Sequence, residues 1–232
     1  MAAGDFQAQV EGLTSLTISA TPTLLELTEF LRDGVNDVTN RWLAVRAQDV
    51  MLFQRESDII DSNSGFDAGG ARIISVIREA EADGSSDNST AWRQCRQVSV
   101  GQKSRVVDPD SLSFASKYNP VYIINDNGKI NVYPVADSTN DGYRVYYVNN
   151  EPKDNTNGAA LTYAHSDIRW FPNDKVYLVA IYAAIKSLEA QIAVYTVDEE
   201  DLELVQGLSA SLGSLKTEYD TAFAIAAPRP AQ

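Results

Sequence analysis

The chain has little of what metal, redox and nucleophilic chemistry require. Its 232 residues include one cysteine, Cys95, and one histidine, His165. A lone cysteine forms no internal disulfide, and one thiolate with one imidazole does not fill a zinc site. No GxSxG elbow or comparable nucleophile setting accompanies His165. We therefore predict a structural role for His165 and no disulfide.

Motifs for phosphate and sugar chemistry are also absent. Neither GxGxxG after a strand nor GxxxxGK[ST] occurs, so the usual cradles for dinucleotides and triphosphates are missing. The pair Gly69-Gly70 stands alone and is typical of a turn. An acidic run is interpreted as a solvated helix start rather than as a glycosidase carboxylate pair: Glu199, Glu200, Asp201 and Glu203. We predict no catalytic or cofactor-binding residues and no enzymatic activity.

Two oxygen-rich stretches are similar to the first half of a calcium-binding loop. One contains Asp83, Ser85, Asp87 and Ser89, and the other contains Asp137, Thr139, Asp141 and Gly142. Twelve-residue calcium loops end in a bidentate glutamate, whereas the equivalent positions here are Gln94 and Val148. Ordinary Asx turns are favoured, and we predict no metal ligands.

Positive charge is scarce. The chain has 19 basic against 32 acidic residues, giving a formal net charge of −13, and no basic run exceeds two residues. Binding to duplex DNA depends on neutralising phosphates with lysine and arginine. We therefore predict no specific binding of nucleic acid.

Long apolar runs are missing as well. The first twelve residues contain an acid and no apolar core, so we expect no secretory signal. The best apolar stretch, residues 176–185, lies between Lys175 and Lys186 with Glu189 beyond, and it falls short of the roughly 20 apolar residues that span a bilayer. We expect no contact with a membrane.

A composition that is 44% hydrophobic predicts a folded chain, and its first strong pattern is helical. Apolar residues recur at steps of three and four along one face: Leu24, Leu27, Leu31, Val35, Val38, Trp42 and Val45. Thr21 or Thr23 can cap this helix, with Pro22 near its first turn. Gly34 inside it indicates either close packing or a mild kink.

From about residue 50 to 150, short β-branched and aromatic runs alternate with turns. The runs are Met51-Leu52-Phe53, Arg72 to Ile77, Arg105 to Val107, Val121 to Ile124, Ile130 to Val135 and Tyr143 to Val148. Asn127-Gly128 predicts a tight hairpin, and residues 118–149 are interpreted as a three-stranded meander. Stretches 61–70 and 81–90 are predicted to be exposed loops, and 149–158 a return to the helices.

Helical patterning resumes at Phe171-Pro172. Residues 172–195 are apolar on nearly every face, which predicts the most buried helix of the protein. A further helix is predicted from the periodic set Leu202, Val205, Leu208, Leu212, Leu215, Tyr219 and Phe223. The last residues, AAPRPAQ, predict an extended tail.

The predicted fold class is α+β: an antiparallel helix bundle, with one N-terminal and two C-terminal helices, and an inserted β-rich region. The bundle comprises residues 1–50 and 160–232, and the insertion comprises residues 51–159. Residues 226–232 form the extended tail.

This organisation resembles the head-to-tail adaptor (connector) proteins of tailed bacteriophages. The resemblance is carried by TPTLLELTEFLRDGVNDVTNRWLA, by YIINDNGKINVYPV with YRVYYV, and by FPNDKVYLVAIYAAIKSLEAQIA. The strand before a helix that opens with Phe-Pro-Asn is similar to virion proteins of marine phages and cyanophages. The resemblance implies a homo-oligomeric ring, usually of twelve subunits, that contacts the portal protein and tail or neck proteins. It also implies a virion protein made in the host cytoplasm, with DNA passing through the lumen.

Two other functions remain open. One is a tail- or fibre-associated binding module for a glycan or another virion protein, using the tyrosines of the predicted meander: Tyr118, Tyr122, Tyr133, Tyr143, Tyr146 and Tyr147. The other is an enzyme with an unrecognised carboxylate pair. For the adaptor, we expect residues 199–232 and the loops 61–70 and 81–90 to make most contacts. Removal of residues 220–232 should then leave the monomer folded but prevent assembly.

Overall fold

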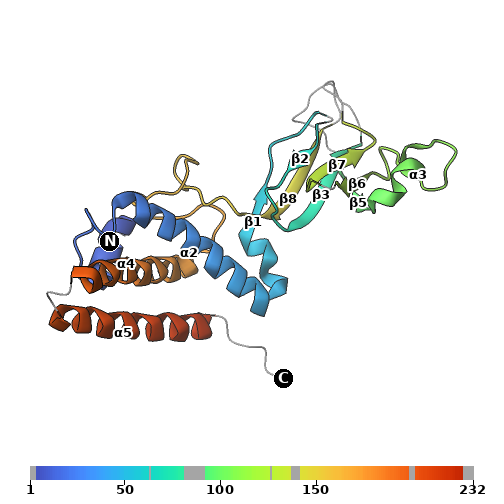
Figure 1. The fold of residues 1–232 in the computed structure, drawn as a ribbon. Helices are drawn as coiled ribbons and strands as arrows, with labels where there is room; N and C mark the ends of the chain where they lie inside the picture. Colours follow the sequence, from blue (N-terminus) through green and yellow to red (C-terminus); the bar gives the residue numbers. More distant parts are fainter. Residues whose placement is uncertain are drawn as a thin grey trace. The chain divides into compact units, whose positions relative to one another are not determined.

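The computed structural model describes residues 4–62, 64–80, 92–125, 127–136, 142–198 and 202–226. The fold is α+β, as predicted, and the chain divides into two compact units. A helical unit comprises Met1–Phe53 and Glu151–Gln232, and a β unit comprises Gln54–Asn150. Figure 1 shows the helices of the first unit and the strands of the second.

Residues 151–159 belong to the helical unit and not to the β-rich region where the sequence analysis placed them. The amide of Arg169 donates to the carbonyl of Lys153 at 2.9 Å, and the amide of Leu161 donates to that of Pro152 at 3.0 Å. These backbone hydrogen bonds tie the stretch to the segment that precedes the helices. Turn-rich composition alone does not reveal such pairing.

The long N-terminal helix matches its prediction. Helix α2 (Leu24–Val45) begins at Thr23, whose side chain accepts a hydrogen bond from the amide of Glu26 while the Glu26 carboxylate accepts one from the amide of Thr23. This reciprocal capping box satisfies amides that the first helical turn leaves unpaired. Its buried apolar residues follow the predicted spacing: Leu27, Leu31, Val35, Val38 and Trp42.

Two short elements of the helical unit differ from the prediction. Helix α1 (Phe6–Thr14) was not predicted; Asp5 caps it, and it buries Phe6 and Val10. The run Met51-Leu52-Phe53 was predicted as a strand but lies in the 3-10 helix η1 (Ala47–Phe53). Of that run only Phe53 is buried, and its ring centroid lies 5.6 Å from that of Phe171. The run therefore buries a single side chain and not the alternate residues that a strand would bury.

Helix α4 (Val176–Asp198) follows the 3-10 helix η3 (Asn173–Lys175) and contacts α1, α2 and α5. It holds the largest group of buried residues of any helix described: Leu178, Val179, Ala180, Ile181, Ala183, Ala184, Ile185, Ser187 and Leu188. Burial stops there, and Val194 is exposed. The predicted core helix therefore has a buried N-terminal part and a poorly covered C-terminal part.

The apolar length of this helix was underestimated from the sequence. Residues Asn173–Thr196 have a mean hydropathy of 1.3 in their most apolar window and are long enough to cross a membrane by length and composition. Half of that window is buried inside the chain. Contacts with three other helices account for this apolar character as that of a core helix.

Gly34 marks the closest approach of α2 to α4. A Cβ atom built at Gly34 would lie 3.1 Å from Cδ1 of Tyr182 and 3.3 Å from the backbone oxygen of Val179. The two helices therefore pack closely at this glycine, which agrees with the first of the two alternatives drawn from the sequence.

Helix α5 (Leu202–Ala226) packs on α4 and reaches α2 through Tyr219 and Phe223. The Tyr219 hydroxyl donates to Asp37 Oδ2 at 2.8 Å, and the Phe223 ring lies 6.2 Å from that of Trp42. Ala226, which was predicted to begin the tail, is helical, and residues 227–232 lie outside the described residues. Residues 220–226 therefore belong to α5, and the partly buried Phe223 contacts Trp42. The outcome of removing residues 220–232 stays a prediction.

The described residues of the β unit form two four-stranded sheets (Figure 1). The first has the order β1-β8-β3-β4 and is antiparallel, with strands β1 (Gln54–Glu56), β8 (Tyr143–Val148), β3 (Ile73–Glu79) and β4 (Trp92–Gln94). The second has the order β2-β7-β6-β5, with strands β2 (Phe66–Asp67), β7 (Lys129–Tyr133), β6 (Val121–Ile124) and β5 (Arg96–Gln97). Only the β5–β6 pair of the second sheet is parallel among the described pairs.

The hairpin is confirmed, but the three-stranded meander is wrong. Strands β6 and β7 pair antiparallel around Gly128, which has a positive φ of 77°. Strand β8 instead pairs with β1 and β3 in the other sheet. Pro134 has no amide to extend the β7 ladder, and the nine residues between Tyr133 and Tyr143 exceed an ordinary hairpin loop, so the chain can change sheets.

Other assignments in the β unit also change. The run Arg105 to Val107, predicted as a strand, lies in helix α3 (Lys103–Val107), which follows the 3-10 helix η2 (Val100–Gln102). The predicted loop 61–70 contains β2. Strands of two or three residues are too short to produce a recognisable alternation.

Candidate functional site: the exposed face of α5

The lone histidine and cysteine both have structural positions. His165 Nδ1 lies 3.0 Å from the amide of Thr162, which donates to it, and the His165 carbonyl accepts from the amide of Phe6 at 2.8 Å. Cys95 is buried, and burial raises the pKa of its thiol to about 12. A thiol in such surroundings is protonated and poorly nucleophilic at neutral pH.

Within the described ranges, no group of three or more His, Cys, Asp or Glu side chains could hold a metal ion. Both calcium-loop candidates, Asp83 to Ser89 and Asp137 to Gly142, lie outside the described residues except for Gly142, and the whole loop 81–90 also lies outside them. Of the acidic run at the start of α5, Glu203 is described, and its side chain is exposed.

The tyrosines considered for glycan binding do not form one exposed face. Tyr122, Tyr133, Tyr143 and Tyr147 are buried in the cores of the β unit. Burial raises the pKa of Tyr143 to about 12. Tyr146 is partly buried, and Tyr118 is exposed outside the strands. Packing therefore accounts for most of this set.

The buried charged pair of the β unit also has a structural role. Arg78 and Glu79 are each 1% exposed. Arg78 Nε donates to the carbonyl of Pro134 at 3.0 Å, and Glu79 Oε2 accepts from the amide of Gly142 at 2.9 Å. These bonds hold the end of β3 to both sides of the crossing between the two sheets.

The described part of the β unit includes two small hollows. One, of about 400 Å³, is bounded by Ser75, Gln94, Arg96 and Tyr122, with the buried Cys95 in its wall. The other, of about 230 Å³, is bounded by Lys103, Asn131 and Tyr143. The Tyr122 hydroxyl donates to Gln97 Oε1 at 3.2 Å in the first. Neither brings together an acid, a base and a nucleophile.

The least covered surface of the helical unit belongs to α5. Among the side chains described for this helix, only Leu215 and Tyr219 are buried. Its outward side carries small exposed residues at helical spacing: Gly207, Ala210, Ser211, Ser214, Thr217 and Thr221. A helix with small residues outward allows another chain to approach its backbone closely.

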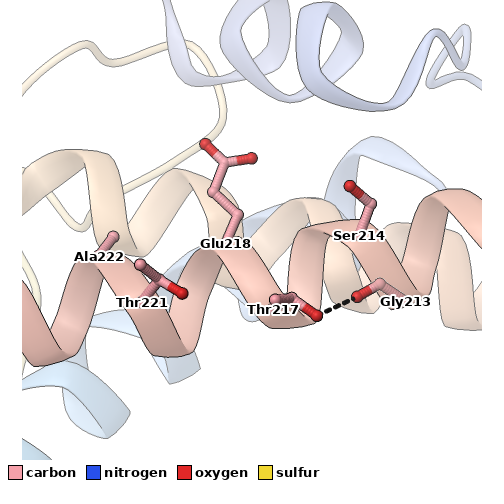
Figure 2. A pocket seen from close by; sticks show the side chains of 6 residues that line it. All are labelled: Gly213, Ser214, Thr217, Glu218, Thr221 and Ala222. Atoms are coloured by element: carbon pink, nitrogen blue, oxygen red, sulfur yellow. Dashed lines mark hydrogen bonds between the residues drawn. The ribbon is translucent and has the colours of Figure 1, made fainter.

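A hollow of about 660 Å³ lies on this side of α5 (Figure 2). It is lined by Gly213, Ser214, Thr217, Glu218, Thr221 and Ala222. Figure 2 shows the Glu218 carboxylate projecting from the same stretch of helix. The Thr217 hydroxyl donates to the carbonyl of Gly213 at 2.9 Å.

Glu218 lines the hollow, and Asp220 lies two residues further along α5. Glu218 accepts a hydrogen bond from the Tyr177 hydroxyl, and this bond raises the pKa of Tyr177 to about 12. Oδ1 of Asp220 lies 3.9 Å from Nη1 of Arg41, and the Asp220 side chain is 78% exposed. Both carboxylates are accessible to a positively charged partner.

Residues 199–232 were predicted from the sequence to make contacts, but this hollow was not predicted. Its signal is the recurrence of small residues at steps of three and four in Gly207, Ala210, Ser214, Thr217 and Thr221. Apolar periodicity instead draws attention to the opposite, packed stripe. Comparison with protein-family models and with curated proteins finds no match to this chain.

Proposed function

We propose that this chain is a structural virion protein, a portal adaptor or head–tail connector that assembles with copies of itself into a ring. The support is architectural: helices from both ends of the chain pack together, and a β unit is inserted between them. This is the organisation on which the resemblance to phage adaptors rests.

The finer arrangement that we propose for the helical unit is an antiparallel bundle of α2, α4 and α5. Pairs along α2 and α4 support opposite directions, because Gly34 lies beside Val179 whereas Trp42 lies beside Lys175, with Nζ 4.1 Å from the ring centroid. For α4 and α5, Lys216 Nζ forms an ion pair with Glu189 Oε1 at 2.9 Å, and the ring centroids of Tyr219 and Tyr182 lie 6.3 Å apart. The residue numbers rise along α5 as they fall along α4, which supports opposite directions for these two helices as well.

The observation that carries the proposal is the exposed face of α5. A 25-residue helix that buries one narrow stripe leaves most of its length uncovered. Val194, near the end of α4, and Leu204, near the start of α5, are also exposed. Surfaces of this kind mark sites of protein–protein contact.

The charge of the chain suits a ring around DNA. A formal net charge of −13 opposes tight contact with phosphates, so a genome can pass through a lumen without binding to its wall. The partners in this proposal are other copies of the chain, usually twelve to a ring, the portal protein, and tail or neck proteins. The location is the head–tail interface of the virion.

Light scattering of the purified chain tests this proposal. An adaptor gives a closed oligomer of about twelve chain masses, either alone or after addition of a portal ring. A trimer would favour the tail- or fibre-associated binding module, and a monomer that stays monomeric in the presence of portal would refute the adaptor.

A further inference from the structure

Residues 92–119 of the β unit form a second candidate contact surface, which we call the basic segment. It includes five large apolar side chains that are exposed: Val100 at 52%, Val107 at 50%, Leu112 at 109%, Phe114 at 41% and Tyr118 at 60%. Figure 1 shows its helix α3 beside β5 and β6. Soluble monomers rarely concentrate so many uncovered apolar side chains in one short stretch.

The basic segment is held in place from beneath. Val106 and Ala115 are buried against Val121, Ile123 and Tyr133. The amide of Ala115 donates to the carbonyl of Val106 at 3.0 Å, which closes the base of the loop that carries Leu112. The exposed side chains therefore project from a folded support, so that little ordering is needed when a partner binds.

The charge of this segment is opposite to that of the rest of the chain. It has five basic residues, Arg93, Arg96, Lys103, Arg105 and Lys117, against two acidic ones, Asp108 and Asp110. Arg93, Arg96, Lys103 and Arg105 are exposed, and none forms an ion pair with the described part of the chain. The two stretches of the helical unit together have 19 acidic and 9 basic residues.

We propose that the basic segment of one copy docks on the α5 face of the next copy. Leu112 enters the hollow beside Ser214 and Thr217, and the unpaired arginine and lysine side chains face Glu218 and Asp220. This inference rests on the proposed function, since it names the contact through which the ring is built. One copy presents both halves of the contact, and such a head-to-tail interface closes into a ring when its rotation permits.

Size and charge favour this occupant. The hollow is a shallow depression along one face of α5 with room for a leucine side chain, and the exposed Glu218 lines it. The five exposed apolar side chains present on the order of 500 Å² of surface, more than half of the roughly 800 Å² that each partner contributes to a stable interface. The exposed basic side chains supply the remainder as a polar rim.

A nucleic acid is the competing occupant. Exposed Leu112 and Val107 offer nothing to phosphates, and Asp108 and Asp110 lie beside them. Contacts with DNA rely on arginine and lysine that face a continuous backbone. The mixture of apolar and basic side chains therefore favours an acidic protein surface.

Disulfide trapping between separately purified variants tests the pairing. Leu112→Cys protein is mixed with Thr217→Cys protein under mild oxidation. In the control mixture, Leu25→Cys replaces Leu112→Cys, because Leu25 is also an exposed leucine, at 77%, but lies on the helical unit. Cys95 is buried and stays out of the reaction. We expect about tenfold more linked dimer from the Leu112→Cys mixture than from the control mixture; equal yields would overturn the proposal.

Assembly of Leu112→Ser and Leu25→Ser separates this inference from the proposed function. We expect Leu112→Ser to raise the concentration needed for assembly about tenfold or more, with an unchanged circular dichroism spectrum, and Leu25→Ser to assemble normally. If the wild type assembles and Leu112→Ser assembles equally well, the docking site is wrong but the adaptor stands. If the wild type never assembles, even with portal, both fail. A gel-shift assay tests the nucleic-acid alternative. If the wild type retards DNA, and Lys103→Glu abolishes this retardation while assembly is unchanged, the basic segment binds nucleic acid and the proposed protein partner is overturned.

Discussion

Replacing Gly34 with alanine tests the close contact between α2 and α4. A glycine inside a helix costs about 1 kcal/mol relative to alanine, so the substitution by itself would stabilise α2. At this position the new Cβ meets Tyr182 Cδ1 at 3.1 Å and the backbone oxygen of Val179 at 3.3 Å. The oxygen cannot move unless α4 moves with it.

Overpacking of this kind costs about 1–3 kcal/mol, which exceeds the gain in helix propensity. We therefore expect Gly34→Ala to destabilise the helical unit by about 1 kcal/mol. Gly207→Ala in α5 is the matched control, because a Cβ there meets nothing within 4 Å. That substitution should stabilise the unit by up to about 1 kcal/mol.

Urea unfolding followed by helical circular dichroism measures the difference. With a slope near 2 kcal/mol per molar, the two variants should differ in midpoint by about 1 M, with Gly34→Ala the lower. Equal stabilisation by both substitutions would show that α2 and α4 are not in close contact at Gly34.

Three further predictions concern the helix cap, the lone cysteine and a buried hydrogen bond. Thr23→Ala should cost about 1 kcal/mol in urea unfolding. Hydrogen bonds from Thr23 lower the pKa of Glu26. The stabilisation of the folded state by the Glu26 carboxylate should therefore be present above the ordinary glutamate pKa and be lost as the pH falls through the lowered pKa. The free energy of unfolding of the wild type and of Glu26→Gln, measured over a series of pH values, would show this loss. Because burial raises the pKa of Cys95 to about 12, Ellman's reagent at pH 8 should label it only after unfolding; rapid labelling of folded protein would contradict its burial. Tyr219→Phe should lower the free energy of unfolding by about 1 kcal/mol, since it removes the hydrogen bond to Asp37. An unchanged free energy in thermal or urea unfolding would show that this hydrogen bond adds nothing to stability.

Long periodic elements could be predicted from the sequence. The spacing from Leu24 to Val45 matches the bounds of α2, because a 22-residue amphipathic helix repeats its apolar stripe many times and carries a capping box at its start. The Asn127-Gly128 hairpin was also predictable, since the turn and both strands are local.

Pairing between distant strands could not be predicted in the same way. Strand β8 alternates as expected, with Tyr143, Val145 and Tyr147 buried, yet its partners are separated from it by about 70 to 90 residues of chain. Alternation specifies which face is buried but not which strand lies alongside. The short helix α1 was missed because nine residues contain only two apolar repeats.

The candidate surface was predicted only in outline. The C-terminal helix was expected to make contacts, but the hollow at Ser214 and Thr217 depends on which side of α5 faces α4. The exposure of Leu112 depends on Val106 and Ala115 anchoring the loop below it. Both features arise from packing, and neither has a sequence motif.

Negative-stain electron microscopy of the purified chain, with and without portal protein, tests the central claim most directly. The account predicts closed rings with an axial opening wide enough for duplex DNA, seen in end-on views with one rotational symmetry, usually twelvefold. Isolated monomers or trimers under both conditions would contradict the assignment of α5 and the basic segment to ring assembly.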